Sequence, residues 1–512
     1  MTLAAVTELR VVNPATLEPV GVVAVMDAEG VAAGLAAARA AQALWAEAPA
    51  QEKRAVLERL ARLVLDRADE IADTVVAETA KPLVEAYTTE LYPALDAVTW
   101  LIKNAARVLA PERLRYRQPH LLHKRGWLVY EPRGVVGVIT PWNFPFAIPF
   151  SQVAYCVAAG NGVVLKPSEL TPLSGLLVER LFEEAGVPRG LVRVVPGDGS
   201  TGEHLVASGV DKVIFTGSAA AGRRVAAAAG GQLVPVTLEL GGKDPMVVLD
   251  DADLPRAVDG ALWSSFVNCG QVCSGVERIY VESALYEPFV EELARRAREL
   301  RLGADVGPLI SSEQRDRVAT LVDDAVSSGA HAVAGGRVPA RQGWFYEPTV
   351  LTGVPREACI EREETFGPVV TVARVADERA AILAANESAF GLGASVWTRD
   401  AARAARVAGR LRAGSVWHND HAYSYGAAQA SWGGRGASGF GRTHSKHGLY
   451  ELVDVKFVDR DRGRIPVPWW YPYGAGAADA FRGALEALYG ERLRGLWRER
   501  SALLALARRY RR

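Results

Sequence analysis

Apolar residues change their spacing along this chain, and the change separates regions with different expected structure. Between about residues 31 and 110 they recur every three or four positions, as at Val56, Leu60 and Val64, which is the spacing of one helix face. From Val135 onward, short β-branched runs alternate with helical stretches. This alternation predicts an α/β fold in which helices cover parallel sheets on both faces.

Two successive α/β regions are expected, and two segments lie outside them. The first region has expected strands at residues 135–140, 163–166, 192–195, 213–216 and 246–249. The second follows Cys273, with expected strands at 278–281, 369–373 and 394–397 and a helix at 284–301. Segments 114–130 and 451–458 are predicted to be extended ribbons, and short exposed strands of this kind often pair with another subunit.

The last fifty or so residues differ in composition from the rest of the chain. Residues 460–473 are rich in proline and aromatic side chains. Beyond them, apolar residues recur at helical spacing among many arginines, at Phe481, Leu485, Leu488, Leu493, Leu496, Leu503 and Leu504. This pattern predicts a basic amphipathic helix.

Composition narrows the class of protein. A chain of 512 residues that is 49% apolar and 23% charged is expected to form two or three globular domains. The 59 basic and 59 acidic residues leave no net charge to attract nucleic acid. No apolar run reaches the roughly 20 residues that a membrane span needs, and residues 1–10 do not resemble a secretion signal. Four cysteines make no disulfide framework in so long a chain, so the cytoplasm is favoured: Cys156, Cys269, Cys273 and Cys359.

Three side chains in short motifs suit catalysis at a carbonyl group. Cys273 is expected in a loop facing a cleft, although a buried structural thiol is the commoner use of a lone cysteine. Glu239 closes an apolar strand before two glycines. Burial there would raise its pKa toward that of a general base, and a solvated strand end is the alternative. The amide of Asn143, within residues 141–145, suits a developing oxyanion, although a turn amide more often bonds its own backbone.

Further segments suggest a nucleotide site. A strand, a glycine turn and a helix follow one another over residues 213–222, and the start of a helix after such a turn attracts phosphate. The spacing is not that of a GxGxxG fingerprint, so this signal alone is weak. Lys166 and Glu169 end a neighbouring strand and offer a cation and a carboxylate to ribose hydroxyls. Residues 363–368 have the composition of an acidic turn.

Taken together, in this order and spacing, these segments resemble the aldehyde dehydrogenase superfamily over residues 5–458. The resemblance, which is to its hydrolytic, non-acylating type, implies that Cys273 attacks an aldehyde, that Asn143 and the Cys273 main-chain N–H hold the oxyanion, and that Glu239 activates water to hydrolyse the resulting thioester. The cofactor-binding residues that it implies are Thr140, Pro141, Trp142, Lys166, Ser168, Glu169, Gly217, Ser218, Gly222, Leu240, Gly241, Glu364 and Phe366.

The resemblance also implies a division into domains. A Rossmann-like dinucleotide-binding domain is expected at residues 1–113 and 133–242, and a catalytic α/β domain at 243–450. The β-ribbon at 114–132 and 451–458 would assemble a dimer or tetramer. The extension at 459–512 exceeds the usual family length, and we expect it to contact a neighbouring subunit rather than a membrane surface.

The cofactor is expected to be NAD. The Glu169 carboxylate would accept hydrogen bonds from a free ribose diol and repel a 2′-phosphate, while Lys166 keeps NADP as an alternative. No metal is expected, although three HxxH pairs have a spacing that can ligate zinc. Many relatives carry a Lys-Glu pair for proton transfer where this chain has Gln152 and Thr443, and His444 is the candidate replacement.

The substrate is predicted from the side chains near the motifs. Aromatic residues near the motifs, namely Trp142, Phe146, Phe266 and Trp417, favour an apolar tunnel and hence an aliphatic or aromatic aldehyde. A succinate-semialdehyde type of substrate is the alternative. Acyl transfer to coenzyme A is a rival reaction that the presence of Glu239 disfavours. A catalytically inactive binding or structural protein on the same scaffold is the rival from another class.

Overall fold

The computed structural model describes residues 7–116, 118, 121, 123–461, 467 and 469–489. The described residues fall into two compact units. The first contains the residues up to Ala110 and those from Glu131 to Asp454, and the second contains those from Pro111 to Tyr130 and from Val455 onward. Within the described residues, no helix combines the length and the apolar character needed to cross a bilayer.

A six-stranded sheet organises the first half of the first unit. Its order is β17-β9-β8-β5-β6-β7, and all neighbouring strands are parallel except β17 and β9. The bounds are β5 (Val135–Ile139), β6 (Gly162–Lys166), β7 (Val192–Val194), β8 (Lys212–Gly217), β9 (Val236–Leu240) and β17 (Gly439–Phe440). From β7 to β9 the order is that of a dinucleotide-binding sheet, in which the strand order reverses between β5 and β8.

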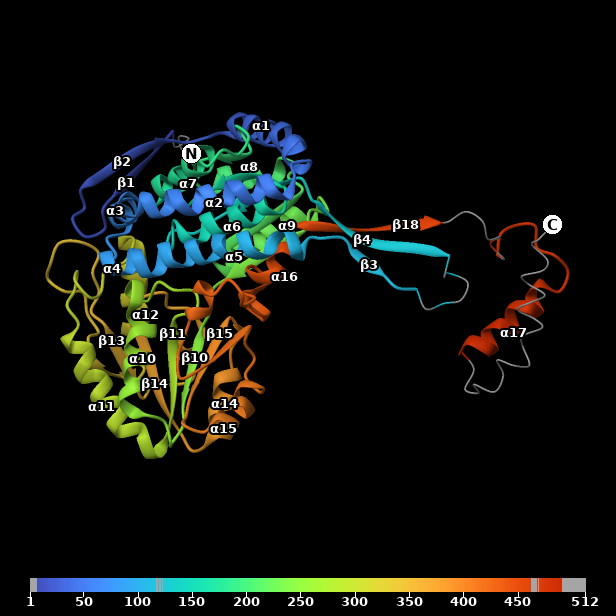
Figure 1. The fold of residues 1–512 in the computed structure, drawn as a ribbon. Coiled ribbons are helices and arrows are strands. Elements are labelled where there is room, and N and C mark those ends of the chain that lie inside the picture. Colours follow the sequence, from blue (N-terminus) through green and yellow to red (C-terminus); the bar gives the residue numbers. More distant parts are fainter. Residues whose placement is uncertain are drawn as a thin grey trace. The chain divides into compact units, whose positions relative to one another are not determined.

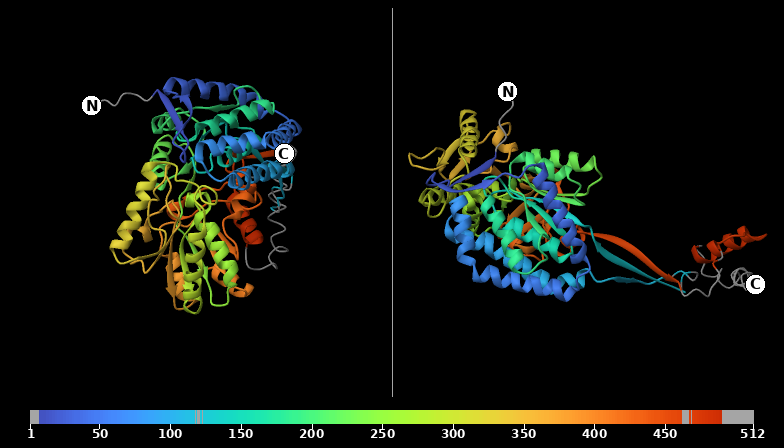
Figure 2. Two further views of the ribbon diagram at one scale, coloured as in Figure 1. Left: turned by 90° about the vertical axis from the view of Figure 1, so that its left-hand side faces the viewer. Right: turned by 90° about the horizontal axis from the view of Figure 1, so that it is seen from above.

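Helices cover both faces of this sheet because its strands are apolar on both sides. On one face α1, α8 and α9 share a buried cluster with β5, β6, β8 and β9. On the other, α6 contacts β5 and β6, and α5 packs on α6. The N-terminal helices that belong to these two layers are drawn in blue in Figure 2. The bounds are α1 (Ala28–Ala46), α2 (Ala50–Asp66), α3 (Ala68–Thr79), α4 (Leu83–Glu85), α5 (Tyr92–Val108), α6 (Ala147–Ala158), α7 (Pro172–Glu184), α8 (Gly199–Ala207) and α9 (Ala219–Gly230). An antiparallel hairpin, β1 (Glu8–Val12) and β2 (Pro19–Ala24), precedes α1.

A seven-stranded sheet organises the second half of the first unit. Its order is β12-β13-β14-β11-β10-β15-β16, and only β12 is antiparallel to its neighbour. Figure 1 shows it below helices α2, α5 and α6, with α10, α11 and α12 on one side and α14 and α15 on the other. The strands are β10 (Asp244–Val248), β11 (Val276–Glu282), β12 (His331–Ala334), β13 (Thr349–Thr352), β14 (Val369–Val375), β15 (Gly393–Trp397) and β16 (Ser415–His418). The helices are α10 (Leu254–Phe266), α11 (Ser283–Glu299), α12 (Ser312–Ser327), α13 (Cys359–Arg362), α14 (Glu378–Asn386), α15 (Ala401–Ala408) and α16 (Ser445–Tyr450).

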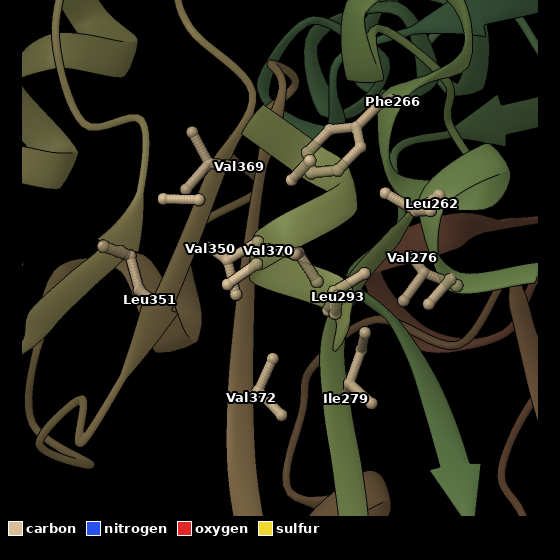
Figure 3. Close-up of a cluster of buried hydrophobic side chains, with 14 of the residues drawn as sticks. Leu262, Phe266, Val276, Ile279, Leu293, Val350, Leu351, Val369, Val370 and Val372 are labelled. Atoms are coloured by element: carbon tan, nitrogen blue, oxygen red, sulfur yellow. The ribbon is translucent and has the colours of Figure 1, made fainter. Parts of the chain in front are cut away.

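Alternation along the central strands explains the two layers of helices. Successive side chains of a strand point to opposite faces of its sheet. In β10, Met246 and Val248 join the core under α10, α11 and α12, whereas Val247 joins the core under α14 and α15. Figure 3 shows part of the core under α10, α11 and α12, where Phe266 and Leu262 of α10 lie near Val276 and other strand residues.

The second unit is a three-stranded ribbon, in which β3 and β4 pair antiparallel, followed by a helix. The ribbon has the order β18-β4-β3, formed by β3 (Glu112–Leu114), β4 (Lys124–Pro132) and β18 (Val453–Asp461). The helix α17 (Ala477–Tyr489) is the described part of the predicted basic helix, and the positions predicted beyond it lie outside the described residues. The expected α/β class with parallel sheets is confirmed.

Candidate active site

The carboxyl ends of four neighbouring strands carry most of the predicted cofactor residues. Thr140, Pro141 and Trp142 follow β5, and Ser168 and Glu169 follow Lys166 at the end of β6. Gly217 ends β8 and Ser218 follows it, while Leu240 ends β9 and Gly241 follows it. Because these strands are parallel, all these residues lie at one edge of the sheet. In sheets of this order, ligands bind at that edge where the strand order reverses, which here lies between β5 and β8.

The backbone at this edge leaves no room for larger side chains at three glycines. A Cβ added at Gly222, in the first turn of α9, would lie 2.5 Å from the Leu240 side chain, so α9 approaches β9 closely. A Cβ at Gly241 would lie 2.2 Å from a carboxylate oxygen of Glu364, and one at Gly217 would lie 2.7 Å from the Phe215 ring. Ser218 caps α9 by accepting a hydrogen bond from the Ala221 N–H, which leaves other N–H groups of the first turn to face an anion.

Other groups at the edge are also suited to a dinucleotide. The hydroxyl of Thr140 is buried, and its Oγ1 has no hydrogen-bond partner among the described residues. The buried Lys166 forms an ion pair with Glu169 at 3.1 Å, while the Glu169 side chain is 45% exposed and so open to a ligand. These residues fit the ribose and pyrophosphate of a nicotinamide dinucleotide.

Cys273 lies in a tight loop between α10 and β11. A single 3₁₀ turn, Val267–Gly270, precedes it, and within that turn Asn268 and Cys269 both adopt positive φ. Gly270 has φ +69°, and a Cβ there would lie 2.1 Å from the Gly367 carbonyl oxygen. The loop therefore requires glycine at this position. Cys273 is partly buried and packs against a cluster formed by Leu392, Trp417 and Trp432, as does Tyr425.

Asn143 reaches the same loop from the other sheet. Its Nδ2 donates a hydrogen bond to the main-chain oxygen of Gln271 at 2.9 Å, two residues before Cys273. Its Oδ1 has no hydrogen-bond partner among the described residues. The main-chain carbonyl of Asn143 accepts from Lys81 Nζ and from Asn268 Nδ2, each at 2.9 Å. These contacts hold the amide beside the cysteine loop.

A buried ion pair that the sequence analysis missed supports Asn143. Lys81 and Glu90 are fully buried and lie 2.6 Å apart. Besides binding Lys81, the Glu90 carboxylate accepts hydrogen bonds from the main-chain N–H groups of Phe146 and Ala147, at the start of α6. The pair therefore fixes both the carbonyl of Asn143 and the helix that follows. Lys81 lies in the short link between α3 and α4, Glu90 lies in the helical stretch that follows, and no sequence signal distinguished either residue.

Glu239 occupies β9 as a buried carboxyl group. It is 5% exposed, and burial raises its pKa to about 8. Oε1 accepts a hydrogen bond from the Thr443 hydroxyl at 3.3 Å, and Oε2 has no hydrogen-bond partner among the described residues. Gln152 donates instead to Thr216 at 2.9 Å, and His444 lies 3.4 Å from the Thr443 hydroxyl. Burial lowers the pKa of His444 to about 4, so it is neutral at physiological pH.

Glu364 and Phe366 close the site from a third segment. The Glu364 carboxylate accepts a hydrogen bond from the Gly242 N–H at 3.0 Å, and burial raises its pKa to about 8. The Phe366 ring meets the Trp142 ring edge to face, with centroids 5.3 Å apart. Glu277, which the sequence did not reveal, holds this segment by accepting from the Phe366 N–H and from Lys243.

The thiol of Cys273 lies among carboxyl groups rather than cations. Burial raises its pKa strongly, and Glu364, Asp244 and Glu239 raise it further, in that order. The thiol is therefore protonated at neutral pH unless a base removes its proton. Among the described residues, no group of three or more metal-ligating side chains is placed to hold a metal ion.

The aromatic residues predicted near a tunnel divide into two groups. Phe266 belongs to the core under α10, and Phe146 is fully buried and stacks on Phe150. Trp417 lies in the cluster against which Cys273 packs, and Trp142 contacts Phe366. Only these last two therefore lie next to the predicted site residues.

Comparison with known proteins agrees with this geometry. The family model described as "Aldehyde dehydrogenase family" matches residues 3–458. A 4,4'-diapolycopene aldehyde oxidase of a Methylomonas species is 39% identical over 462 residues, which cover 89% of this chain and 87% of the relative. The betaine aldehyde dehydrogenase of Bacillus subtilis is 37% identical and covers 90% of this chain and 95% of the relative.

Solved structures show the same fold. The structure of an aldehyde dehydrogenase from Bacillus cereus in complex with NAD+ superimposes with a TM-score of 0.85 at 34% identity, covering 89% of this chain and 93% of that one. A putative aldehyde dehydrogenase from Burkholderia cenocepacia gives a TM-score of 0.86 at 32% identity, covering 91% and 96% of the two chains. With a match across residues 3–458, which contain every segment of the candidate site, this chain belongs to the aldehyde dehydrogenase family.

Proposed function

We propose that this chain oxidises an aldehyde to a carboxylic acid with NAD or NADP, through a thioester on Cys273. The observation that carries the proposal is the convergence of three side chains from separate segments. Asn143 is bound to the loop of Cys273, and the Glu239 carboxyl is close enough to that thiol to raise its pKa. A nucleophile, an amide donor and a base are the groups that this reaction needs.

Each residue has a defined task in the reaction. The Cys273 thiolate adds to the carbonyl carbon, and the Asn143 amide and the Cys273 N–H hold the negative charge that develops on the oxygen. The C–H bond then breaks with loss of a hydride, which leaves a thioester on sulfur. NAD(P), when bound, supplies the hydride acceptor. Glu239 takes a proton from water as the water adds to the thioester, the C–S bond breaks, and the acid leaves.

The cofactor site favours NAD. The partly exposed Glu169 carboxylate can accept hydrogen bonds from both hydroxyls of a free ribose, and its charge opposes a 2′-phosphate. Its ion pair with Lys166 reduces that opposition, so NADP is a second cofactor. The Bacillus cereus relative is an NAD+ complex, and a relative from Mycolicibacterium smegmatis is named a putative NADP+-dependent succinate-semialdehyde dehydrogenase.

The substrate we favour is an apolar aldehyde, aliphatic or aromatic. Cys273 packs against an aromatic and aliphatic cluster, and the titratable groups that act on its thiol are carboxyls, which offer no positive charge to a substrate carboxylate. The relative named for 4,4'-diapolycopene aldehyde is consistent with this preference. Succinate semialdehyde is the second candidate, because several relatives are named as putative succinate-semialdehyde dehydrogenases.

A panel of aldehydes tests the reaction and the substrate together. Hexanal, benzaldehyde, a long-chain aldehyde and succinate semialdehyde are incubated with NAD or NADP, without coenzyme A, and NADH or NADPH is followed by absorbance. We expect turnover of the apolar aldehydes with NAD, and none by Cys273→Ala. Dependence on coenzyme A would identify an acylating enzyme, and no turnover of any aldehyde would favour the inactive scaffold. A preference for succinate semialdehyde would refute the proposal that the substrate is an apolar aldehyde.

We further propose how the chain is divided and assembled. Residues 1–113 and 133–242 form the dinucleotide-binding domain, 243–450 the catalytic domain, and the ribbon at 114–132 and 451–458 assembles a dimer or tetramer. The extension at 459–512 contacts a neighbouring subunit, and its exposed Trp470 and Tyr471 offer apolar surface for that contact. Deletion of this extension is expected to change the oligomeric state measured by light scattering, or to admit bulkier aldehydes. An unchanged oligomeric state together with an unchanged substrate range would refute the contact.

The location that we propose for this protein is the cytoplasm. All four cysteines are free thiols, as is usual in a reducing compartment.

A further inference from the structure

A buried histidine bonds to the main chain directly after Cys273. His421, in the loop that follows β16, is 1% exposed. Its Nε2 lies 2.7 Å from the main-chain oxygen of Ser274. Because a carbonyl oxygen can only accept, Nε2 carries the hydrogen, and the ring is in the Nε2–H form. Nδ1 has no hydrogen-bond partner among the described residues, and the Trp417 ring packs on the imidazole with centroids 4.6 Å apart.

A buried carboxyl group lies next to this histidine. Asp244, the first residue of β10, is 1% exposed, and its carboxyl accepts a hydrogen bond from the Gly393 N–H. Its Oδ2 has no hydrogen-bond partner among the described residues and lies 4.0 Å from His421 Nε2. Among the described residues, the side chains of Asp244 and His421 therefore bond only to main-chain groups.

Close packing places the Asp244 carboxyl directly behind the nucleophile loop. A Cβ at Gly393 would lie 2.2 Å from Asp244 Oδ2. A Cβ at Gly242 would lie 2.7 Å from Asp244 Oδ1 and 2.3 Å from the main-chain oxygen of Cys273. The Asp244 carboxyl and the Cys273 carbonyl thus both pack into the small space that Gly242 leaves. Because this space is tightly filled, a shift of the carboxyl would displace the main chain of Cys273.

Both members of the pair are uncharged at neutral pH. Burial raises the pKa of Asp244 to about 8 and lowers the pKa of His421 to about 4. Of the charged residues that face Asp244, Arg278 lowers its pKa and Glu277 raises it, and burial outweighs both. A neutral pair can hold the loop without adding negative charge beside the thiol, where Glu364 and Glu239 also lie.

We propose that His421 and Asp244 are positioning residues that hold the main chain on both sides of the bond between Cys273 and Ser274. His421 does so by donating to the Ser274 carbonyl, and Asp244 by filling the space beside the Cys273 carbonyl. The proposal rests on the proposed role of Cys273 as nucleophile. A nucleophile displaced by 1 Å loses ~10²-fold in rate, so a partial loosening of this loop has a measurable effect.

Substitutions at His421 test the hydrogen bond. His421→Leu removes the donor and keeps an apolar side chain, whereas His421→Gln keeps a side-chain N–H that can reach the Ser274 carbonyl. The matched control is His418→Gln, because His418 bonds a main-chain oxygen in the same way, that of Thr398 at 2.9 Å. For each variant we measure kcat, KM for aldehyde and for NAD, the thermal midpoint, and the rate at which iodoacetamide alkylates Cys273.

The expected pattern separates positioning from a general loss of structure. His421→Leu should lower kcat and the alkylation rate by about tenfold, within the ~10²-fold limit for a misplaced group, with KM for NAD unchanged. His421→Gln should recover most of both rates, and His418→Gln should match the parent. Parental rates in His421→Leu, or equal losses in the Leu and Gln variants, would overturn the proposal. So would a fall in NAD binding parallel to the fall in kcat.

If His421→Leu fails to fold, Asp244→Asn provides an independent test of the proposal. The amide is neutral, as the protonated carboxyl is, and it keeps an oxygen that can accept from Gly393. Its kcat at neutral pH should therefore stay within about threefold of the parent's, whereas Asp244→Ala should lose about tenfold. A tenfold loss of kcat in the Asp244→Asn variant would overturn the inference that Asp244 works as an uncharged carboxyl. Cys273→Ala is run in parallel: turnover by that variant would refute the proposed function, whereas an inactive Cys273→Ala beside a fully active His421→Leu would refute only the positioning role.

Discussion

Replacing Glu239 by glutamine is expected to stop turnover and to stabilise the protein at the same time. The carboxyl is 5% exposed, and its Oε2 has no hydrogen-bond partner among the described residues, so ionising it in the folded protein is costly. Glutamine has nearly the same shape, and its Oε1 can still accept the hydrogen bond from Thr443. It cannot ionise, and it cannot take a proton from water.

The size of the stabilising effect follows from the pKa of Glu239. Burial raises this pKa from 4.5 to about 8, so between these pH values the folded protein keeps a proton that the unfolded chain has lost. The folded form binds more protons, so its stability falls as pH rises, by ~1.36 kcal/mol per pH unit. Relative to Glu239→Gln, the parent should lose about 5 kcal/mol of unfolding free energy across this window. Asp244 and Glu364 titrate in the same range but are present in both proteins, so their contributions cancel.

Urea unfolding of the two proteins, followed by tryptophan fluorescence at about pH 5 and about pH 8, measures this difference. We expect similar midpoints at the lower pH, where the carboxyl is protonated in the folded protein, and a higher midpoint for the glutamine variant at the upper pH. A constant difference between the two proteins at both pH values would show that Glu239 does not have a raised pKa.

The kinetic half of the prediction uses the same variant. Without its base, the variant should release about one NADH per Cys273 and then stall as the thioester accumulates, which mass spectrometry detects as an acyl adduct. In the parent, the hydrolysis rate should rise as pH approaches about 8, because Glu239 acts as a base only when ionised. Parental steady turnover by the variant would refute the assignment of this residue. The absence of any first turnover would show that Glu239 is needed before the thioester forms.

Three further substitutions have definite expected outcomes. Lys81→Met leaves the buried Glu90 carboxylate without its cation, and should cost about 3–5 kcal/mol of stability and lower kcat; the double variant with Glu90→Gln should recover part of the stability in urea titrations. Gly241→Ala places a Cβ against Glu364 and should raise KM for NAD, with little change in the thermal midpoint. Glu169→Gln should lower the ratio of kcat/KM with NAD to that with NADP, because the amide no longer repels a 2′-phosphate.

The parts of the fold that could be predicted are those with a regular burial pattern. The central parallel strands are buried on both faces and so appear as β-branched runs, and β5, β6, β8, β11 and β15 lie at or within a residue or two of their expected positions. Short or edge strands carry less signal. The hairpin of β1 and β2 and the two-residue strand β17 were not predicted, because few of their residues are buried.

In the candidate site too, some residues carry a sequence signal and others do not. Asn143, Glu239 and Cys273 were recognised because their segments, taken together in this order and spacing, resemble those of the aldehyde dehydrogenase superfamily, whereas none of the three segments is specific alone. Their supports were not recognised. Lys81 lies in the link between α3 and α4, and Glu90 lies in helical sequence. Lys81 meets the Asn143 carbonyl, and Glu90 meets the N–H groups of Phe146 and Ala147, through contacts between residues more than fifty positions apart. A single sequence contains no periodicity that reports such pairs, because each partner satisfies the local pattern of its own element.

The three carboxyls around Cys273 set a condition on how this site works. Glu239, Asp244 and Glu364 each have a pKa raised to about 8, and each raises the pKa of the thiol. Four negative charges cannot share so small a volume at low cost, so at neutral pH the protons stay on the acids and the sulfur. Cys273 therefore differs from cysteines activated by a neighbouring cation. Its thiolate must form by passing the thiol proton to one of these carboxyls in its ionised form, which is a minor fraction at neutral pH, rather than by resting ionised. Alkylation of Cys273 should accordingly be slow at neutral pH and should rise with pH, and a fast, pH-independent reaction would show that a positive charge stabilises the sulfur.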